Sequence, residues 1–99
     1  MGRLILHSEA EQELDQAVTY YEKAKSGLGR EFRDEVLRSL AKIAENPMRY
    51  SVRKLDVRWA NLDRFPYNVN YTVEGEDIVI VAIAGNRQKP FYWLRRLAN

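Results

Sequence analysis

Residues 78–84 read IVIVAIA, seven consecutive apolar residues without polar alternation. A strand that carries apolar side chains on both faces is typical of the centre of a sheet that is covered on both sides. The preceding segment YNVNYTV (residues 67–73) alternates tyrosine or valine with asparagine or threonine, which predicts a strand with one exposed face. The residues between them, EGED (74–77), predict a turn, so we expect the two strands to pair as an antiparallel hairpin.

Weaker strand patterns lie further from this hairpin. RLILH (residues 3–7) and VRWANL (residues 57–62) are predicted strands, and residues 93–97 are predicted to form a short terminal helix. Neither repeats nor linkers interrupt the chain, so we expect residues 1–99 to form a single domain.

Two amphipathic helices are predicted between the first two strands. Ser8 and Glu11 have the spacing of a capping box, so Ser8 is the expected N-cap of the first helix. The second helix is expected over about residues 29–45, because Asn46 and Pro47 stop it. The apolar stripes of the two helices are Ala10, Leu14, Ala17, Val18 and Tyr21, and then Phe32, Val36, Leu40 and Ile43.

The link SGLG (residues 26–29) is too short for anything but antiparallel neighbours, so the two helices form a hairpin. The expected fold class is therefore α+β, in the order β-α-α-β-β-β. A small antiparallel sheet carries the N-terminal helical hairpin on one face, and a short C-terminal helix follows.

The composition excludes several classes of protein. The chain has no cysteine, which removes disulfide frameworks and thiolate metal sites, and it has a single histidine, His7. One histidine argues against a histidine-based zinc site or a His-dependent triad, so neither a metal nor a cofactor is expected. No apolar stretch approaches the length of a membrane span, and we expect a cytoplasmic protein without membrane contacts.

Charge is distributed unevenly along the chain. Residues 1–47 carry nine acidic and seven basic side chains, whereas residues 48–99 carry five acidic and nine basic ones. This asymmetry suggests an anionic partner for the second half.

The first helix holds two groups of candidate residues. Glu9, Glu11 and Glu13 do not all share a helix face, so their simplest interpretation is a solvated first turn that compensates the helix dipole. Tyr21 belongs to the buried stripe, while Tyr20 lies about 100° around the helix, where it either packs on the core or contacts a partner.

Two groups of cations follow in the second half. Arg53, Lys54, Arg58 and Arg64 lie on or beside a predicted strand, where cations either bind a partner or protect a sheet edge. The second group is interleaved with aromatic residues, which could either form a metal-free ribonuclease site or close the sheet, although no general base is evident. It comprises Arg87, Lys89, Phe91, Tyr92, Trp93, Arg95 and Arg96.

Several segments together resemble a known family. These are AEQELDQAVTYYEKAKSGLGREF, ENPMRY, RFPYNVNYTV and IVIVAIAGNRQKPFYW, which cover nearly the whole chain. In order and spacing they resemble the ParE/RelE superfamily of toxins from type II toxin–antitoxin modules. The resemblance implies a cognate antitoxin that lays a helix or strand over the hairpin and sheet. Its expected contacts are Tyr20, Tyr21, Leu28 and Phe32.

The superfamily divides by mechanism. RelE-like members cleave messenger RNA in the ribosomal A site, and ParE-like members poison DNA gyrase. By resemblance, Arg87 matches the arginine after the last strand and Tyr92 falls near a terminal tyrosine, but Asn68 stands where the nucleases carry an arginine. The resemblance therefore favours a non-enzymatic, ParE-like toxin that contacts gyrase. The target contacts expected are Arg58, Arg64, Arg87, Lys89, Tyr92 and Trp93.

Two alternatives remain open from the sequence. One is a ribosome-dependent mRNA endonuclease with a divergent site built from Lys54, Arg58, Arg87 and Tyr92. The other is a degenerate binding domain without toxicity.

Overall fold

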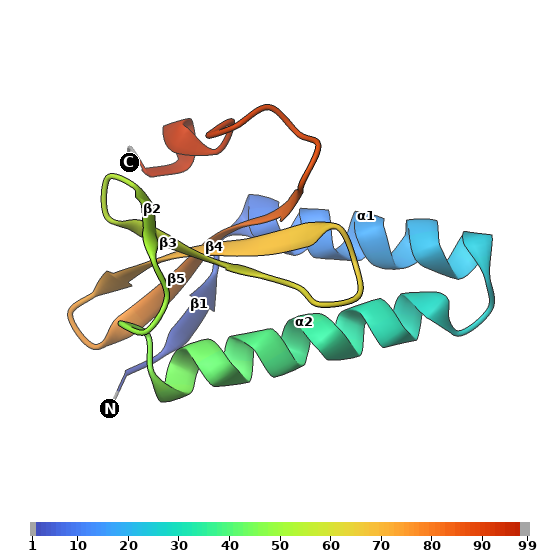
Figure 1. Ribbon diagram of the computed structural model, residues 1–99, viewed down its shortest axis with the longest axis horizontal. Helices are drawn as coiled ribbons and strands as arrows, with labels where there is room; N and C mark the ends of the chain where they lie inside the picture. Colours follow the sequence, from blue (N-terminus) through green and yellow to red (C-terminus); the bar gives the residue numbers. More distant parts are fainter. Residues whose placement is uncertain (1, 98–99) are drawn as a thin grey trace.

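The chain folds into five strands and two α-helices, as a computed structural model that describes residues 2–97 shows (Figure 1). The elements in chain order are β1 (Leu4–Leu6), α1 (Ser8–Ala24), α2 (Leu28–Glu45), β2 (Val52–Lys54), β3 (Val57–Asn61), β4 (Tyr67–Glu74), β5 (Asp77–Gly85) and the 3-10 helix η1 (Leu94–Leu97). The predicted α+β class and the helical hairpin are confirmed.

The sheet has the strand order β1-β5-β4-β3-β2, with β5 inside it as predicted. The expected β4–β5 hairpin is present, with Glu74 opposite Asp77 across the turn. β1 is the one strand that pairs in parallel, with Leu4 opposite Ile78. The sheet is therefore mostly, not wholly, antiparallel.

Strand β2 was not predicted. It has three residues, two of which are cations, so it offers no apolar alternation from which a strand could be recognised. It pairs antiparallel with the start of β3 and forms the edge of the sheet opposite β1.

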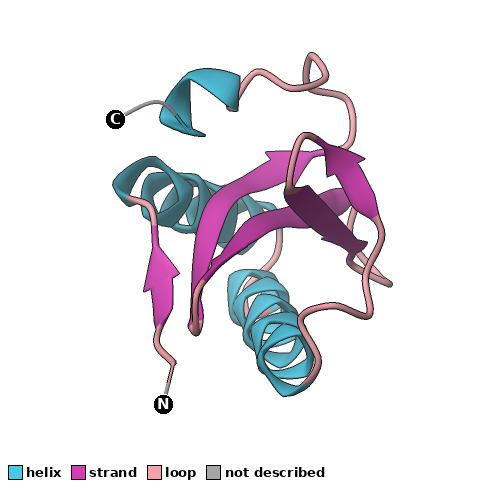
Figure 2. Ribbon diagram, turned by 90° about the vertical axis from the view of Figure 1, so that its left-hand side faces the viewer, coloured by secondary structure: helices cyan, strands magenta, loops and turns pink. Residues whose placement is uncertain are grey.

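Both faces of the sheet are covered (Figure 2). The helical hairpin packs on one face, where both predicted stripes join a core that includes Val69, Tyr71 and Ile80. The chain after β5 crosses the other face, where Trp93 packs on Val57, Val81 and Ala82 in a second, smaller cluster. Neither helix in residues 2–97 combines the length and apolar composition needed to cross a membrane.

This second layer makes one prediction wrong. The face of β4 that was expected to be exposed is buried, with Asn68 3%, Asn70 0% and Thr72 8% accessible. The cause is the C-terminal segment, which returns over the sheet and puts Trp93 on that side.

The predicted cap of α1 is also wrong. Ser8 lies inside the helix, and the cap is His7, whose Nδ1 accepts a hydrogen bond from the Glu9 N–H at 3.1 Å. The His7 N–H donates to the Ile80 carbonyl at 2.9 Å, so pairing with β5 continues to this residue and the helix begins immediately after it.

Candidate functional site

A shallow groove of about 390 Å³ lies between α1 and the far end of the β4–β5 pair. Tyr20 and Tyr21 come from α1, and Arg87 comes from the loop after β5, so residues 66 positions apart share one surface. This aromatic groove is lined by Tyr20, Tyr21, Pro66, Tyr67, Gly85, Asn86, Arg87 and Gln88.

The rings in the groove are supported from below. The Tyr21 ring centroid lies 5.2 Å from that of Phe32 and 4.9 Å from that of Phe65, and both phenylalanines are buried. Tyr20 packs edge-on against Tyr21 at 5.1 Å but remains 66% exposed. The groove thus has a closely packed aromatic base and one projecting ring.

Burial shifts the pKa values of the two tyrosines that form the floor of the groove. It raises the pKa values of the Tyr21 and Tyr67 hydroxyls above their usual range, with neighbouring tyrosine hydroxyls and, for Tyr67, the Glu13 carboxylate adding to the effect. These hydroxyls therefore remain neutral hydrogen-bond donors over a wider range of alkaline pH than an exposed tyrosine.

The loop that carries Arg87 is fixed by its own hydrogen bonds. Gln88 accepts from the Gly85 N–H at 2.7 Å through its side chain and donates its N–H to the Gly85 carbonyl at 3.1 Å. The Asn86 N–H also donates to the Pro66 carbonyl at 2.8 Å. Arg87 is thus exposed on a closed turn attached to the β3–β4 connection.

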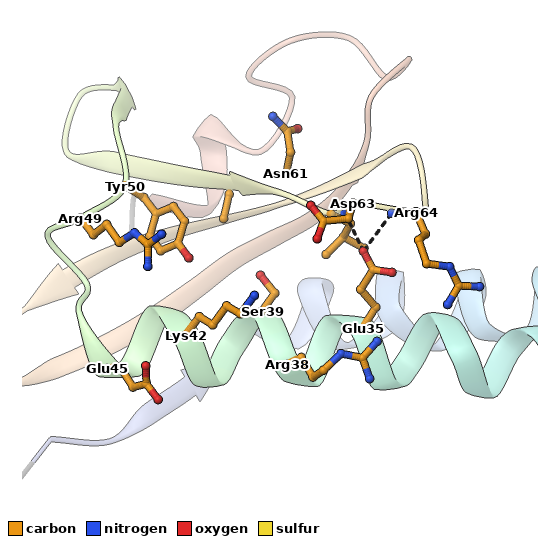
Figure 3. Close-up of a pocket in the computed structure, with 12 residues that line it drawn as sticks. Glu35, Arg38, Ser39, Lys42, Glu45, Arg49, Tyr50, Asn61, Asp63 and Arg64 are labelled. Carbon is orange, nitrogen blue, oxygen red and sulfur yellow. Dashed lines mark hydrogen bonds between the residues drawn. The ribbon is translucent and has the colours of Figure 1, made fainter.

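Glu35 holds the other side of that connection (Figure 3). It reaches from α2, and its Oε2 accepts from the Asp63 N–H at 2.6 Å and the Arg64 N–H at 3.1 Å. These bonds lie at one side of a polar groove of about 550 Å³ between α2 and β3. Because Phe65 and Pro66 follow directly, Glu35 positions the loop that enters the aromatic groove.

A cluster of charged residues fastens the C-terminal segment to α1. Glu13 accepts from both Arg96 Nη1 (3.1 Å) and Nη2 (2.8 Å), and also from the Tyr92 hydroxyl at 2.5 Å and the Ile83 N–H at 3.0 Å. Arg96 donates further to the Val81 carbonyl at 3.0 Å. We call this cluster, completed by the pair of Glu9 with Arg95, the C-terminal clasp.

The clasp corrects the interpretation of the acidic first turn. The Glu13 and Arg96 side chains are only 16% and 5% exposed, so Glu13 is a buried partner rather than a solvated dipole compensator. Burial, followed by the hydrogen bond to Glu13, raises the pKa of the Tyr92 hydroxyl far above its usual range. Glu11 alone of the three glutamates is exposed as expected.

Amide side chains fill the sheet face beneath the C-terminal segment. Asn68 Oδ1 accepts from Asn70 Nδ2 at 2.6 Å and from Arg53 Nη1 at 3.4 Å, and Asn68 Nδ2 donates to Asn86 Oδ1 at 2.7 Å. Residue 68, at which the resemblance contrasts this chain with the nucleases, thus has a neutral side chain that hydrogen-bonds to other residues of this chain.

The four residues of the proposed nuclease site do not converge. Arg58 faces the helical side, where it donates to the carbonyls of Met48 and Tyr50 at 3.3 and 2.6 Å. Lys54 lies on the opposite side, with its Nζ 5.3 Å from the centre of the Phe91 ring. Arg87 is in the aromatic groove, and Tyr92 is in the clasp.

The other predicted contacts divide by accessibility. Lys89 is exposed, Leu28 is half-buried, and Arg64 is exposed but paired with Glu31 at 2.6 Å. Phe32 and Trp93 are buried, at 0% and 1%, so a partner cannot reach their side chains in this conformation.

Sequence reasoning missed Glu35 and interpreted Glu13 wrongly as solvated. Glu35 stands beside Val36 and three residues after Phe32, and an acid so close to a buried stripe was an available signal. Glu13 had no comparable local signal. In residues 2–97, no group of three or more histidine, aspartate or glutamate side chains is placed to hold a metal ion.

Comparisons with known proteins agree with this architecture. Residues 4–90 match the sequence model of a family described as the ParE toxin of the type II toxin–antitoxin system parDE. A structure of a chromosomal ParDE toxin–antitoxin system from P. aeruginosa is similar, with a TM-score of 0.76 and 19% identity over 86% of this chain and 96% of that one.

A second similar structure is the isolated RelE toxin of E. coli. Its TM-score is 0.54, with 17% identity over 95% of this chain and 96% of that one. At such identities the two structures show a shared fold and nothing more. A comparison with curated proteins found no match.

Proposed function

Because the chain belongs to the ParE toxin family of type II toxin–antitoxin systems, we propose that it inhibits growth by binding DNA gyrase through the aromatic groove. Protein contacts of high energy are enriched in tyrosine and arginine on rigid supports. Tyr20 and Arg87 supply two exposed side chains of these types, and the rings beneath Tyr21 hold the base still.

The observation that carries this proposal is the separation of Lys54, Arg58, Arg87 and Tyr92. Acid–base catalysis requires its groups within hydrogen-bond reach of one substrate position. Here Arg58 and Lys54 lie on opposite faces of the sheet, and the Tyr92 hydroxyl is bonded to Glu13. This arrangement supports action by binding over action by RNA cleavage.

The same groove is the proposed site of neutralisation. A similar structure is described as a ParDE toxin–antitoxin system, and we propose that this chain likewise has a cognate antitoxin. An antitoxin segment that covers Tyr20 and Tyr21, and extends to Leu28, would exclude gyrase by occupying the surface it needs. Such competition requires no change in the toxin's fold.

A supercoiling assay tests the proposal. The purified chain is added to gyrase with relaxed plasmid, and it is expected to inhibit supercoiling or to trap cleaved DNA. Tyr20→Ala and Arg87→Ala should each lower this potency at least about tenfold, as expected for a contact worth about 1.4 kcal/mol or more. Arg30→Ala and Leu37→Ala, which change exposed residues outside the groove, should leave it unaltered.

Each alternative has its own readout. No effect on gyrase at excess toxin overturns the gyrase proposal. New A-site cuts in messenger RNA, detected by primer extension on exposed ribosomes, would assign the endonuclease activity instead. Unimpaired growth on expression without the antitoxin would assign the non-toxic binding domain.

A further inference from the structure

Three cations meet at one corner of the C-terminal face: Arg53 and Lys54 of β2, and Lys89 of the loop before η1. The Arg53 guanidinium carbon lies 4.3 Å from the centroid of the Trp59 ring and 5.4 Å from that of Phe91. Lys54 Nζ lies 5.3 Å from the Phe91 centroid. Lys89 lines the same small pocket as Arg53 and Phe91. We call these three residues the basic corner.

The ring at the centre of this corner is held in an unusual backbone conformation. Phe91 has a φ of 61°, in the left-handed region that favours glycine, and it follows Pro90 in a turn closed by a Tyr92 N–H to Lys89 carbonyl bond of 3.4 Å. The ring packs edge-on against the buried Trp93, at 6.0 Å and 86°. The turn thereby fixes the ring over which both β2 cations lie.

No acid neutralises the corner among residues 2–97. Arg3, Arg64, Arg95 and Arg96 each have a carboxylate within 4 Å, whereas no ion pair of this kind joins Arg53, Lys54 or Lys89 to a described residue. Asp56, the nearest acid in the sequence, is exposed in the β2–β3 turn and has no ion pair either. The corner therefore presents three positive charges that no carboxylate of a described residue offsets, because the internal contacts of Arg53 and Lys54 are with neutral groups.

The geometry points to a nucleic-acid backbone as the ligand, and to a duplex in particular. We propose that the basic corner binds the phosphate groups of double-stranded DNA. Single strands are typically held by exposed rings on which unpaired bases stack. Here the Trp59 and Phe91 rings carry Arg53 and Lys54, so the corner offers charge without a free stacking platform. The proposal goes beyond the gyrase contact, because it concerns DNA and a different surface.

Salt dependence measures the contact directly. Binding of the purified chain to a labelled duplex of about 20 base pairs is followed by fluorescence anisotropy, without gyrase. Three neutralised phosphates predict a loss of affinity of about 40-fold between 50 and 200 mM salt. The double variant Lys54→Gln/Lys89→Gln retains one cation, so its affinity should fall only about threefold over the same range.

A matched variant controls for total charge. Lys23→Gln/Arg30→Gln removes two exposed cations from the other end of the long axis, near the α1–α2 turn (Figure 1), and should keep the steep salt dependence. Thermal unfolding confirms that both variants are folded. The proposal would be overturned if the chain did not bind the duplex, or if it bound single-stranded RNA of the same length more tightly. It would also be overturned if the control variant reduced the salt dependence of binding as much as Lys54→Gln/Lys89→Gln does. Because gyrase is absent, none of these results depends on the proposed function.

Discussion

Tyr92 and Glu13 are 79 positions apart in the sequence, and the Tyr92 hydroxyl donates to Glu13 Oε2 at 2.5 Å. The same carboxylate holds both terminal nitrogens of Arg96. One side chain of α1 therefore joins two residues of the C-terminal segment to the helix, beside the pair of Glu9 with Arg95. The hydrogen bonds to Glu13 thus connect the C-terminal segment, which carries Tyr92 and Arg96, to the N-terminal helix α1.

Removal of Glu13 is expected to be strongly destabilising. Glu13→Ala leaves the largely buried Arg96 guanidinium with only Glu9, at 3.6 Å, as an ion-pair partner, and it leaves the Ile83 N–H without its acceptor. It should lower the free energy of unfolding by about 3 kcal/mol. Arg95→Ala breaks an exposed pair and should have a much smaller effect. Urea unfolding followed by circular dichroism measures both. Similar losses for the two variants would show that the clasp has no special energetic role.

Stability should fall in acid. The pKa values of Glu9, Glu31 and Asp77 are lowered, first of all by hydrogen bonds from Arg95, Arg64 and the Arg3 N–H respectively. A lowered folded-state pKa contributes stability above the ordinary values of 4.5 and 3.8, and this is lost as pH falls through the folded values. Urea unfolding between pH 6 and 3 checks this. The decline should be smaller in 1 M salt and in Glu9→Gln/Glu31→Gln, and an increase in stability toward pH 3 contradicts it.

The cap of α1 gives a prediction in which two neighbouring residues are compared. His7→Ala removes the acceptor of the Glu9 N–H and should cost about 1 kcal/mol, whereas His7→Asp should restore most of it. Ser8→Ala should have little effect, because Ser8 is inside the helix. A larger loss for Ser8→Ala in thermal unfolding would return the capping role to Ser8.

Supplying the missing nuclease cation should not create a nuclease. Asn68→Arg places a charge in a buried position beside Arg53 and leaves Asn70 and Asn86 without their partner. A loss of stability of at least about 1–3 kcal/mol is expected, without RNA cleavage. Asn68→Ala removes the same hydrogen bonds without adding a charge, so comparing its stability with that of Asn68→Arg separates the two effects. Cleavage by Asn68→Arg in primer extension would show that the remaining groups form a site after all.

The elements predicted best were those with a local pattern. The helical spacing of the stripe from Phe32 to Ile43 predicts one buried helix face, and the apolar run 78–84 predicts a strand that is buried on both faces. All of the stripe residues are buried in the structure. The polar face of β4 was predicted wrongly as exposed, even though the neighbouring run 78–84 was interpreted as covered on both sides. A strand that pairs with such a neighbour is covered by the same layers, so Asn68 and Asn70 could have been predicted as buried.

The site was less predictable because its contacts are distant in sequence. Tyr20 and Arg87 were each singled out, but nothing in the sequence brings them into one groove. Glu13 looked solvated because its partners, Tyr92 and Arg96, lie at the other end of the chain. Lys54 and Arg58 lie on opposite faces of the sheet because the register between β2 and β3 is irregular, and this irregularity cannot be predicted from the composition.

The parallel pairing of β1 with β5 has a consequence for the order of folding. Synthesis delivers β1 and both helices before residues 77–85, yet Leu4 has its strand partner only at Ile78. Until β5 is available, the stripes of α1 and α2 can pack only on each other and on the β3–β4 segment, and contacts across more than 70 positions must still form. The helical hairpin is the local, fast-forming part of the molecule, and a single late strand converts it into a native protein. A nascent chain that stops before β5 should therefore expose apolar helix faces and remain inactive.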